Sequence, residues 1–467
     1  MLRLFSKARA VAPLARGLQT FSYASPKTVT TTLPNGLTVA SETQPADKTA
    51  TVGVWIDAGS RAENEANNGT AHFLEHLSFK STEKRTQKQL ELEIEQIGGH
   101  LNAYTSRENT VFYAKSLKED VPKIVDILSD ILQSSKLEPA AVENERSVIL
   151  REAEEVDKIY EEVLFDQLHS VAFQGQPLGR TILGPKENIE TITQHELKQY
   201  IAKNYKADRM VLVGSGAVEH EELVQLAKKY FGELPASTSP VEPGKGSIAP
   251  GETSNFVGSE VRIRDDTIPT ANVAIAVEGV SWESPDYYPS LVAQAVIGSW
   301  DRVSSTANTQ GSKLAQIVSR NHLASSFMSF STSYNDTGLW GIYLVTDKEE
   351  TLDDLVHFTL KQWNRLSVDV SDAEVERAKS QLKASLLLSL DGSTASAEDI
   401  GRQLVTTGRR ETPEEVERAV DSVSTKDVRA FAQKYLWDRD IAIAALGRIQ
   451  YLRDYMRIRN DMSMMRW

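Results

Sequence analysis

The chain has 467 residues, of which 40% are hydrophobic and 25% charged, so we expect a globular protein of two or more domains. It contains no cysteine, which excludes disulfides, thiolate metal sites and cysteine catalysis and leaves histidine and carboxylate as metal ligands. The formal net charge of -13 disfavours nucleic acid as a partner, and no apolar run approaches the ~18 residues of a membrane-spanning helix.

The first 25 residues differ in composition from the rest of the chain. They carry no acidic residue and four basic ones, Arg3, Lys7, Arg9 and Arg16. A basic, acid-free and amphipathic N-terminus is typical of a mitochondrial transit peptide, which we predict for residues 1–25; the alternative is a flexible tail. Removal of the four charges changes the formal net charge from -13 to -17, which favours basic partners.

The segments that follow predict a mixed α and β structure. Residues 32–40 contain Asn35-Gly36 between two extended runs, which indicates a β-hairpin, and residues 51–56 predict a third strand. The later elements are, in chain order, a helix at 87–97, a hairpin of strands at 100–105 and 110–114, helices at 121–133, 140–167 and 195–204, a strand at 210–214 and a helix at 221–231.

A His-x-x-Glu-His motif, His72 to His76, lies between the third strand and these helices. Its apolar positions predict a buried helix, on which His72 and His76 lie on one face, one turn apart. Two imidazoles so placed can bind one Zn²⁺, and Glu75 can reach a water bound to that ion and take its proton. This is the inverzincin pattern of a metal-activated hydrolase. The alternative is a structural helix with two surface histidines.

The helix predicted at 140–167 offers a third ligand. Glu145 and Glu152 are seven residues apart and therefore share a face of this helix. Glu162 and Asp166, four residues apart on the same helix, form a like-charge pair that destabilises a helix by roughly 0.2 to 0.5 kcal/mol. A solvated acidic face is the alternative for most of these residues. Because the motif needs a carboxylate from a second helix, we favour Glu152 as the third ligand.

A break rich in Pro, Gly and Ser at 234–255 predicts a linker between two domains, 26–233 and 256–467. The second half repeats the first, since residues 49–52 match 270–273 at an offset of 221. One supersecondary unit has therefore been used twice.

The second copy lacks the candidate ligands. The offset of 221 places Ala-Gln-Ala-Val-Ile, residues 293–297, where His72 to His76 stand in the first copy. The match of the acidic helix places Ala378 opposite Glu145 and Ser385 opposite Glu152. Loss of the whole set together is expected if these residues form one site, present in the first copy and absent from the second.

Four segments give the chain a close resemblance to the pitrilysin family of zinc peptidases, in the branch of the β-type mitochondrial processing subunits and the core proteins of ubiquinol-cytochrome c reductase. They are residues 72–76, 101–108, 148–152 and 177–185, and the resemblance extends from about Lys27 to the C-terminus. It implies an α+β fold of two homologous domains from an internal duplication. Each domain would be a mixed, mainly antiparallel sheet with helices on one face, and the two would enclose a cavity.

The resemblance also implies a role for each candidate residue. His72, His76 and Glu152 would bind one Zn²⁺ per chain, with Glu75 as the general base and Glu145 as a supporting carboxylate. Phe79 would lie at the pocket for the residue after the cut, and Asn102 and Ala103 would pair with the substrate as an added strand. Glu162 and Asp166 would bind the arginine two residues before the cut, which offsets their mutual repulsion.

Two functions follow from the resemblance. The first is a subunit of a zinc metalloendopeptidase that removes N-terminal presequences from imported mitochondrial precursors and is active as a heterodimer. The second is a structural core subunit 1 of respiratory complex III, and one polypeptide serves both roles in some fungi and in plants. The expected partners are an α subunit similar to core protein 2, which supplies a glycine-rich loop not evident here, basic presequence peptides and complex III subunits. The expected location is the mitochondrial matrix or the matrix side of the inner membrane.

Overall fold

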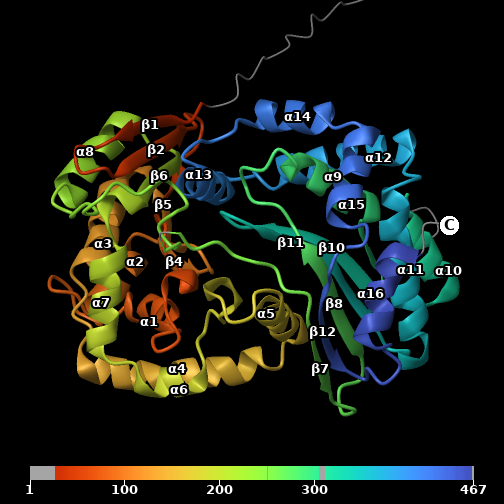
Figure 1. The fold of residues 1–467 in the computed structure, drawn as a ribbon. Coiled ribbons are helices and arrows are strands. Elements are labelled where there is room, and N and C mark those ends of the chain that lie inside the picture. The colour runs from red at the N-terminus through yellow and green to blue at the C-terminus, as the bar shows by residue number, and fades with distance from the viewer. Residues whose placement is uncertain (1–26, 250, 304–310, 465–467) are drawn as a thin grey trace, which may run out of the picture.

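Two six-stranded sheets, one in each half of the chain, organise the fold (Figure 1). The computed structural model describes residues 27–249, 251–303 and 311–464, so the predicted transit peptide at 1–25 lies outside the described residues. None of the helices in the described ranges is long and apolar enough to cross a membrane.

The first sheet has the strand order β1-β2-β6-β3-β5-β4 and only one parallel pair, β2 with β6. Its strands are β1 (Val29–Thr32), β2 (Thr38–Thr43), β3 (Thr49–Ile56), β4 (His100–Thr105), β5 (Thr110–Leu117) and β6 (Met210–Gly216). Helices of the same half pack on one face. They are α1 (Thr70–Leu77), α2 (Gln87–Gln96), α3 (Val121–Gln133), α4 (Pro139–Val156), α6 (Lys186–Thr191), α7 (Gln194–Asn204) and α8 (His220–Phe231).

The second sheet has the order β7-β12-β8-β11-β10-β9, and its parallel pair is β7 with β12. Its strands are β7 (Glu260–Arg264), β8 (Ala271–Glu278), β9 (Ser299–Asp301), β10 (Ser326–Ser333), β11 (Gly338–Thr346) and β12 (Ala442–Gly447). The helices of this half are α9 (Tyr287–Ile297), α10 (Lys313–Asn321), α11 (Leu352–Leu366), α12 (Asp372–Leu388), α14 (Pro413–Ser422), α15 (Thr425–Tyr435) and α16 (Tyr455–Met464).

The two sheets share one topology over five strands. In order across the sheet, β2, β6, β3, β5 and β4 correspond to β7, β12, β8, β11 and β10, with the same parallel and antiparallel pairings. The predicted α+β fold with an internal duplication is therefore confirmed. Residues 293–297 lie on α9, which packs against α12 as α1 packs against α4. Ala378 and Ser385 lie on α12.

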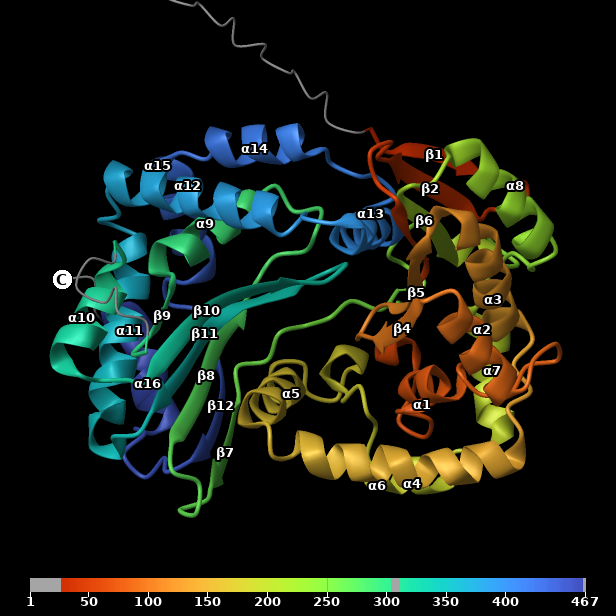
Figure 2. The ribbon, with the colours of Figure 1, turned by 180° about the vertical axis from the view of Figure 1, so that it is seen from behind.

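One helix of each half lies on the sheet of the other half. The helix α5 (Tyr160–Ala172) packs on β8 and β12, and α13 (Ser393–Thr407) packs on β3 and β6. Figure 2 shows both helices between the two sheets. Strand side chains alternate, so Trp55 and Val213 face α13 while Val54 and Leu212 face the helices of their own half. The far face of each sheet is thus covered by a helix from the opposite half.

The prediction of one continuous helix at 140–167 was wrong. The chain leaves α4 at Asp157 and starts α5 after Ile159, whose backbone is not helical. Acidic side chains near a helix C-terminus oppose the helix dipole, whereas Glu161 and Glu162 in the first turn of α5 are favoured by it. The break turns the chain from the first half onto the second sheet. Glu162 and Asp166 therefore lie on a different helix from Glu152.

The segment predicted as a linker, 234–255, contains no helix or strand among its described residues but is held against the first half. Gly246 N donates to Asp57 Oδ2 at 2.8 Å, and Ser247 Oγ donates to the Glu108 carbonyl at 2.9 Å. The domain limits at 26–233 and 256–467 stay a prediction.

Candidate metal centre

The helix α1 is fixed at its N-terminus by a buried carboxylate. Glu63 accepts hydrogen bonds from Gly69 N at 2.9 Å, Ala71 N at 2.6 Å and Asn68 Nδ2 at 2.8 Å. A carboxyl group at this end satisfies free N–H groups and, when ionised, the helix dipole. Burial raises the pKa of Glu63 to about 7, although the hydrogen bonds from Ala71, Asn68 and Gly69 lower it. Gly69 has a φ of 105°, and a Cβ there would lie 2.8 Å from the Leu183 carbonyl oxygen, so only glycine fits. The orientation of α1 is therefore set before any metal binds.

Two histidines of α1 meet a carboxylate of α4. The rings of His72 and His76 lie with their centroids 4.7 Å apart. Glu152 Oε2 lies 2.9 Å from His76 Nε2 and 3.7 Å from His72 Nε2. Among the described residues these three form the single group of His, Asp and Glu side chains with ligand atoms within 4.8 Å of one another.

This donor set fits a divalent metal ion. Glu152 Oε2 is buried and makes no well-formed hydrogen bond within the described part of the chain, although both imidazole Nε2 atoms approach it. Two imidazole nitrogens and one carboxylate oxygen are the ligands of a catalytic zinc site, in which the fourth position stays open. A cation between the three atoms would satisfy all of them.

The protonation states also suit metal binding. Burial, together with the neighbouring His76, lowers the pKa of His72 to about 4, so its imidazole is neutral at physiological pH. The pKa of Glu152 is lowered, mainly by its contact with His76 and to a smaller extent by the nearby His72. Burial opposes the charge on His76, but the adjacent carboxylates of Glu152 and Glu145 outweigh burial and raise its pKa. A bound cation would take the place of that proton.

Glu145 supports the second histidine from behind. Its Oε1 accepts a hydrogen bond from His76 Nδ1 at 3.1 Å, which leaves Nε2 of that ring to face Glu152. Its Oε2 lies 2.9 Å from Lys80 Nζ, and the Glu145 side chain is buried. Lys80 thus neutralises a carboxylate that burial would otherwise penalise. Neither this lysine nor Glu63 was singled out from the sequence, because both act through contacts that no motif spacing shows.

Glu75 lies beside the three candidate ligands and is held by a hydroxyl. Thr105 Oγ1, at the end of β4, donates to Glu75 Oε2 at 2.6 Å and leaves Oε1 without that bond. Burial raises the pKa of Glu75, and the bond from Thr105 partly offsets this. A raised carboxylate pKa matches the requirement of a general base that works near neutral pH.

A cleft of about 760 Å³ opens beside the three candidate ligands. Glu75, His76, Phe79 and Asn102 all line it. Phe79 packs edge to face on Phe112 of the core, with ring centroids 6.4 Å apart. Asn102 and Ala103 belong to β4, the edge strand of the first sheet, whose outer side has no neighbouring strand among the described residues. The cleft therefore combines apolar side chains with an unpaired strand edge, at which the Ala103 N–H donates to Asn102 Oδ1 at 2.9 Å.

The acidic pair on α5 lies apart from these residues. Glu162 is exposed, whereas Asp166 is half-buried and is paired with Arg107 of the turn between β4 and β5. The structure thus brings together His72, Glu75, His76, Glu145 and Glu152 and places Phe79 and Asn102 along the adjoining cleft, with Ala103 next to Asn102 in β4. Glu162 and Asp166 lie on a helix that rests on the second sheet.

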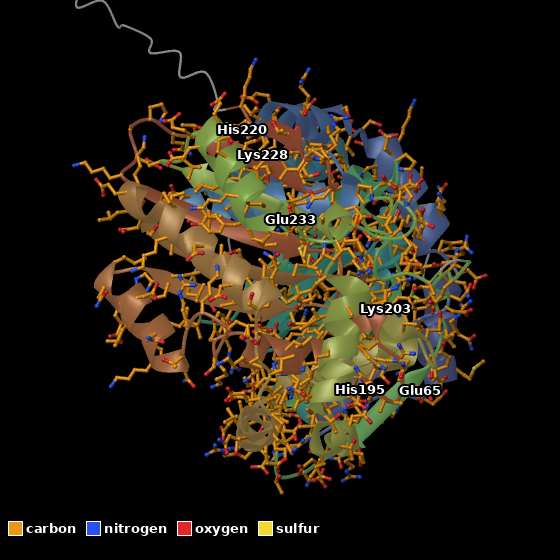
Figure 3. The ribbon with its side chains drawn as sticks, turned by 90° about the vertical axis from the view of Figure 1, so that its left-hand side faces the viewer. Glu65, His195, Lys203, His220, Lys228 and Glu233 are labelled. Atoms are coloured by element: carbon orange, nitrogen blue, oxygen red, sulfur yellow. The ribbon has the colours of Figure 1, made fainter. Side chains whose placement is uncertain are left out.

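Two of the other histidines lie outside this arrangement. His195 on α7 and His220 on α8 are on the outer side of the first half (Figure 3). His220 is hydrogen-bonded to Thr31 and Ser41, which accounts for both of its ring nitrogens.

Comparison with known protein families also divides the chain into a first part that contains the candidate ligands and a second part that lacks them. The pattern of the insulinase family, peptidase family M16, matches residues 38–186, and that of the peptidase M16 inactive domain matches residues 191–382. The first match contains all the candidate ligands, and the second contains the copy that lacks them, as far as α12.

Curated relatives cover nearly the whole chain. The mitochondrial-processing peptidase subunit beta of Neurospora crassa is 65% identical, over 98% of this chain and 96% of that protein. The subunit of the same name from Saccharomyces cerevisiae is 58% identical, over 92% and 94%. The human one is 50% identical, over 94% and 88%. Among solved structures, a chain of complex III2 from Candida albicans, determined with Inz-5 bound, matches 93% of this chain and 100% of its own length, with a TM-score of 0.83 and 32% identity.

Proposed function

Because this chain belongs to the insulinase family of peptidases, M16, we propose that it is the zinc-binding subunit of a metalloendopeptidase that removes N-terminal presequences from mitochondrial precursor proteins. The observation that carries this proposal is the convergence of His72, His76 and Glu152 beside Glu75. Family membership implies a metal, and two imidazoles with one carboxylate form a ligand set of catalytic zinc sites, so we propose one Zn²⁺ per chain.

The side chains divide the chemistry between them. When bound, Zn²⁺ supplies a Lewis acid that polarises a carbonyl group and acidifies water. Glu75 takes the proton of the attacking water on Oε1, while Thr105 holds Oε2 and keeps the carboxylate in place. Glu145 fixes the ring of His76 through Nδ1, so the histidine presents Nε2.

Binding of an extended peptide follows from the cleft. The outer edge of β4 at Asn102 and Ala103 offers main-chain groups that a substrate strand can pair with. Phe79 would contact the aromatic or apolar residue after the cut, since it lines the same cleft as Glu75. Glu162 and Asp166 would bind the arginine two residues before the cut through charge-assisted hydrogen bonds. The acidic chain suits a basic substrate.

The relatives' names include the word "beta", which implies a second, α-type subunit, and they place this chain in mitochondria. We infer that the peptidase is active as a heterodimer with such a partner, either in the matrix or on the matrix side of the inner membrane.

The decisive experiment is cleavage of a synthetic presequence peptide with arginine two residues before the cut. The chain would be co-expressed with an α-type partner and compared with Glu75→Gln, which keeps the three candidate ligands but removes the base. Chelator-sensitive cleavage that is lost in Glu75→Gln, with zinc content unchanged, would support the proposal. A wild-type dimer that holds stoichiometric zinc and cuts no presequence peptide would refute it.

A second function is favoured by the structural match to a chain of complex III2. The chain would then be a core subunit of ubiquinol-cytochrome c reductase, either as its sole function or in addition to proteolysis. Fractionation separates the cases, because a core subunit sediments with the inner membrane until detergent releases it. A chain found wholly in the matrix fraction would exclude the core-subunit role.

A further inference from the structure

The acidic pair on α5 already holds a guanidinium group of this chain. Arg107 Nη2 lies 2.5 Å from Asp166 Oδ1, and Arg107 Nε donates to the Leu178 carbonyl at 3.2 Å. The Arg107 side chain is 10% exposed, whereas that of Asp166 is 36% exposed. Asp166 therefore has one oxygen taken by a buried partner and still faces solvent.

The backbone at Arg107 is fixed by close contacts. Arg61 N donates to the Arg107 carbonyl at 2.7 Å, and Ser60 N donates to that of Ser106 at 3.2 Å. A Cβ on Gly59 would lie 2.3 Å from the Ser106 carbonyl oxygen, so the neighbouring segment approaches as closely as a glycine permits. The guanidinium of Arg107 thus extends from a rigid turn.

The corresponding turn of the second half holds the same helix. Thr-Ser-Arg-Glu-Asn-Thr at 105–110 matches Thr-Ser-Tyr-Asn-Asp-Thr at 332–337, which sets Tyr334 opposite Arg107. Tyr334 OH is hydrogen-bonded to His169 Nε2 at 2.6 Å, three residues after Asp166 on α5. The two equivalent turns therefore contact α5 at neighbouring positions. Arg107 of the first turn contacts the acidic pair, whereas Tyr334 of the second turn contacts His169.

The two carboxylates of the acidic pair differ in whether their charge is already neutralised. Glu162 is exposed, and no hydrogen bond or ion pair to it is found within the described part of the chain. With Arg107 included, the group formed with Glu162 and Asp166 carries a net charge of -1 rather than -2. A second guanidinium arriving there would find Glu162 free and Asp166 shared.

We propose that Arg107 is a positioning residue for recognition of the substrate arginine: it holds Asp166 by Oδ1, leaves Oδ2 for the substrate, and makes Glu162 the dominant charge. This inference rests on the proposed function for the role of the acidic pair. Because the substrate must share Asp166 with an internal arginine, binding stays moderate and the cleaved presequence can leave.

The test measures binding, so that cleavage does not interfere. A fluorescent presequence peptide with arginine two residues before the cut is titrated into the heterodimer that carries Glu75→Gln, and a peptide with citrulline there is titrated in parallel. The ratio of the two affinities reports the charge at this position alone. Loss of one partly exposed charge pair changes such a ratio by about twofold to fivefold.

In this background Asp166→Asn should lower the arginine-to-citrulline ratio less than Glu162→Gln does. Arg107→Met should raise the ratio by about twofold to fivefold, since Asp166 then offers its full charge. Combining Arg107→Met with Asp166→Asn should cancel that gain. Arg107→Lys, which restores the charge, should return the ratio toward the wild-type value. Arg418→Met on the exposed face of α14 is the matched control.

A ratio unchanged or lowered in Arg107→Met would overturn the inference, as would an equal loss of both peptides, which indicates only a displaced α5. These results differ from failure of the proposed function, in which the wild-type heterodimer with zinc cuts neither peptide. The affinity ratio would still decide the role of Arg107 in that case.

Discussion

Replacing Arg61 should weaken the contact between the two halves of the protein and lower its free energy of unfolding. Its Nη1 lies 2.7 Å from Glu108 Oε1, and its Nη2 lies 2.7 Å from Asp336 Oδ2, so one guanidinium joins the equivalent turns of both halves. The side chains of Arg61, Glu108 and Asp336 are 1%, 4% and 13% exposed. Arg61→Met keeps much of the side-chain volume but leaves Glu108 buried without its cation.

The magnitude follows from the burial of that carboxylate. Removing one partner of a buried ion pair costs about 3 to 5 kcal/mol, and the lower end applies here because Asp336 can regain water. Burial already raises the pKa of Glu108 to about 7, although Arg61 and the Asn335 backbone lower it. Without Arg61 this pKa must rise further.

The sign of the pH dependence follows by linkage. A carboxyl with a raised pKa in the folded state contributes stability that is fully present below its unfolded pKa and is lost as pH rises through the folded pKa, by about 1.4 kcal/mol per pH unit. In the wild type, the contribution of Glu108 to stability is lost by about pH 7. In Arg61→Met, where the pKa of Glu108 is higher, this contribution continues to fall above pH 7. We therefore expect a destabilisation of about 3 kcal/mol at pH 8 and about 2 kcal/mol at pH 6.

Urea unfolding at pH 6 and pH 8, followed by the fluorescence of the seven tryptophans, measures the free energy of unfolding for both proteins. Arg61→Met with Glu108→Gln is the matched control, because it removes the stranded charge and should be more stable at pH 8 than Arg61→Met alone. A loss below about 1 kcal/mol at pH 8, or one that is larger at pH 6, would refute the reasoning.

Three further changes test the metal centre and the contact between halves. Glu145→Gln, which weakens support of His76, should lower zinc affinity by about 10- to 100-fold, measured by competition with a chelator. Glu63→Gln turns an amide toward the N–H groups of α1 and should cost about 1 to 2 kcal/mol in urea unfolding, with faster loss of zinc. Gly401→Ala places a Cβ 2.1 Å from Trp55 Cδ2 and should cost about 1 to 3 kcal/mol, whereas unchanged stability would mean that α13 moves freely on β3.

Local features of the fold and the site could be predicted from the sequence. The separation of His72 and His76 is set by one helical turn, and the Asn35-Gly36 turn sets the first hairpin. In contrast, the break after α4 was missed, because a run of charged residues fits a continuous helix equally well until the far sheet is known. Helix propensity depends on neighbours within a few residues, whereas the position of α5 depends on β8 and β12, which begin about 100 and about 270 residues after α5 ends.

Residues that support the site were missed for the same reason. Arg61 lies 275 positions before Asp336, and Arg107 lies 59 before Asp166, so no periodicity connects them. In the sequence nothing distinguishes Glu63 from the other acidic residues, whereas in the structure it is buried and accepts hydrogen bonds from three N–H donors. A signal existed in the internal repeat, since residues 105–110 and 332–337 match in type. Their contact with one another and with α5 required the folded chain.

The exchange of helices between halves gives the copy without the candidate ligands a structural role in the proposed function. The candidate ligands rest on the first half, whereas the helix that carries Glu162 and Asp166 rests on the second sheet. Under the proposed function, the distance between the cut and the substrate arginine would be set by the contact between the two halves, through Arg107 on one side and Tyr334 on the other. Loss of the ligands from the second copy would then leave catalysis intact, whereas loss of the sheet face that supports α5 would displace the substrate arginine relative to the cut.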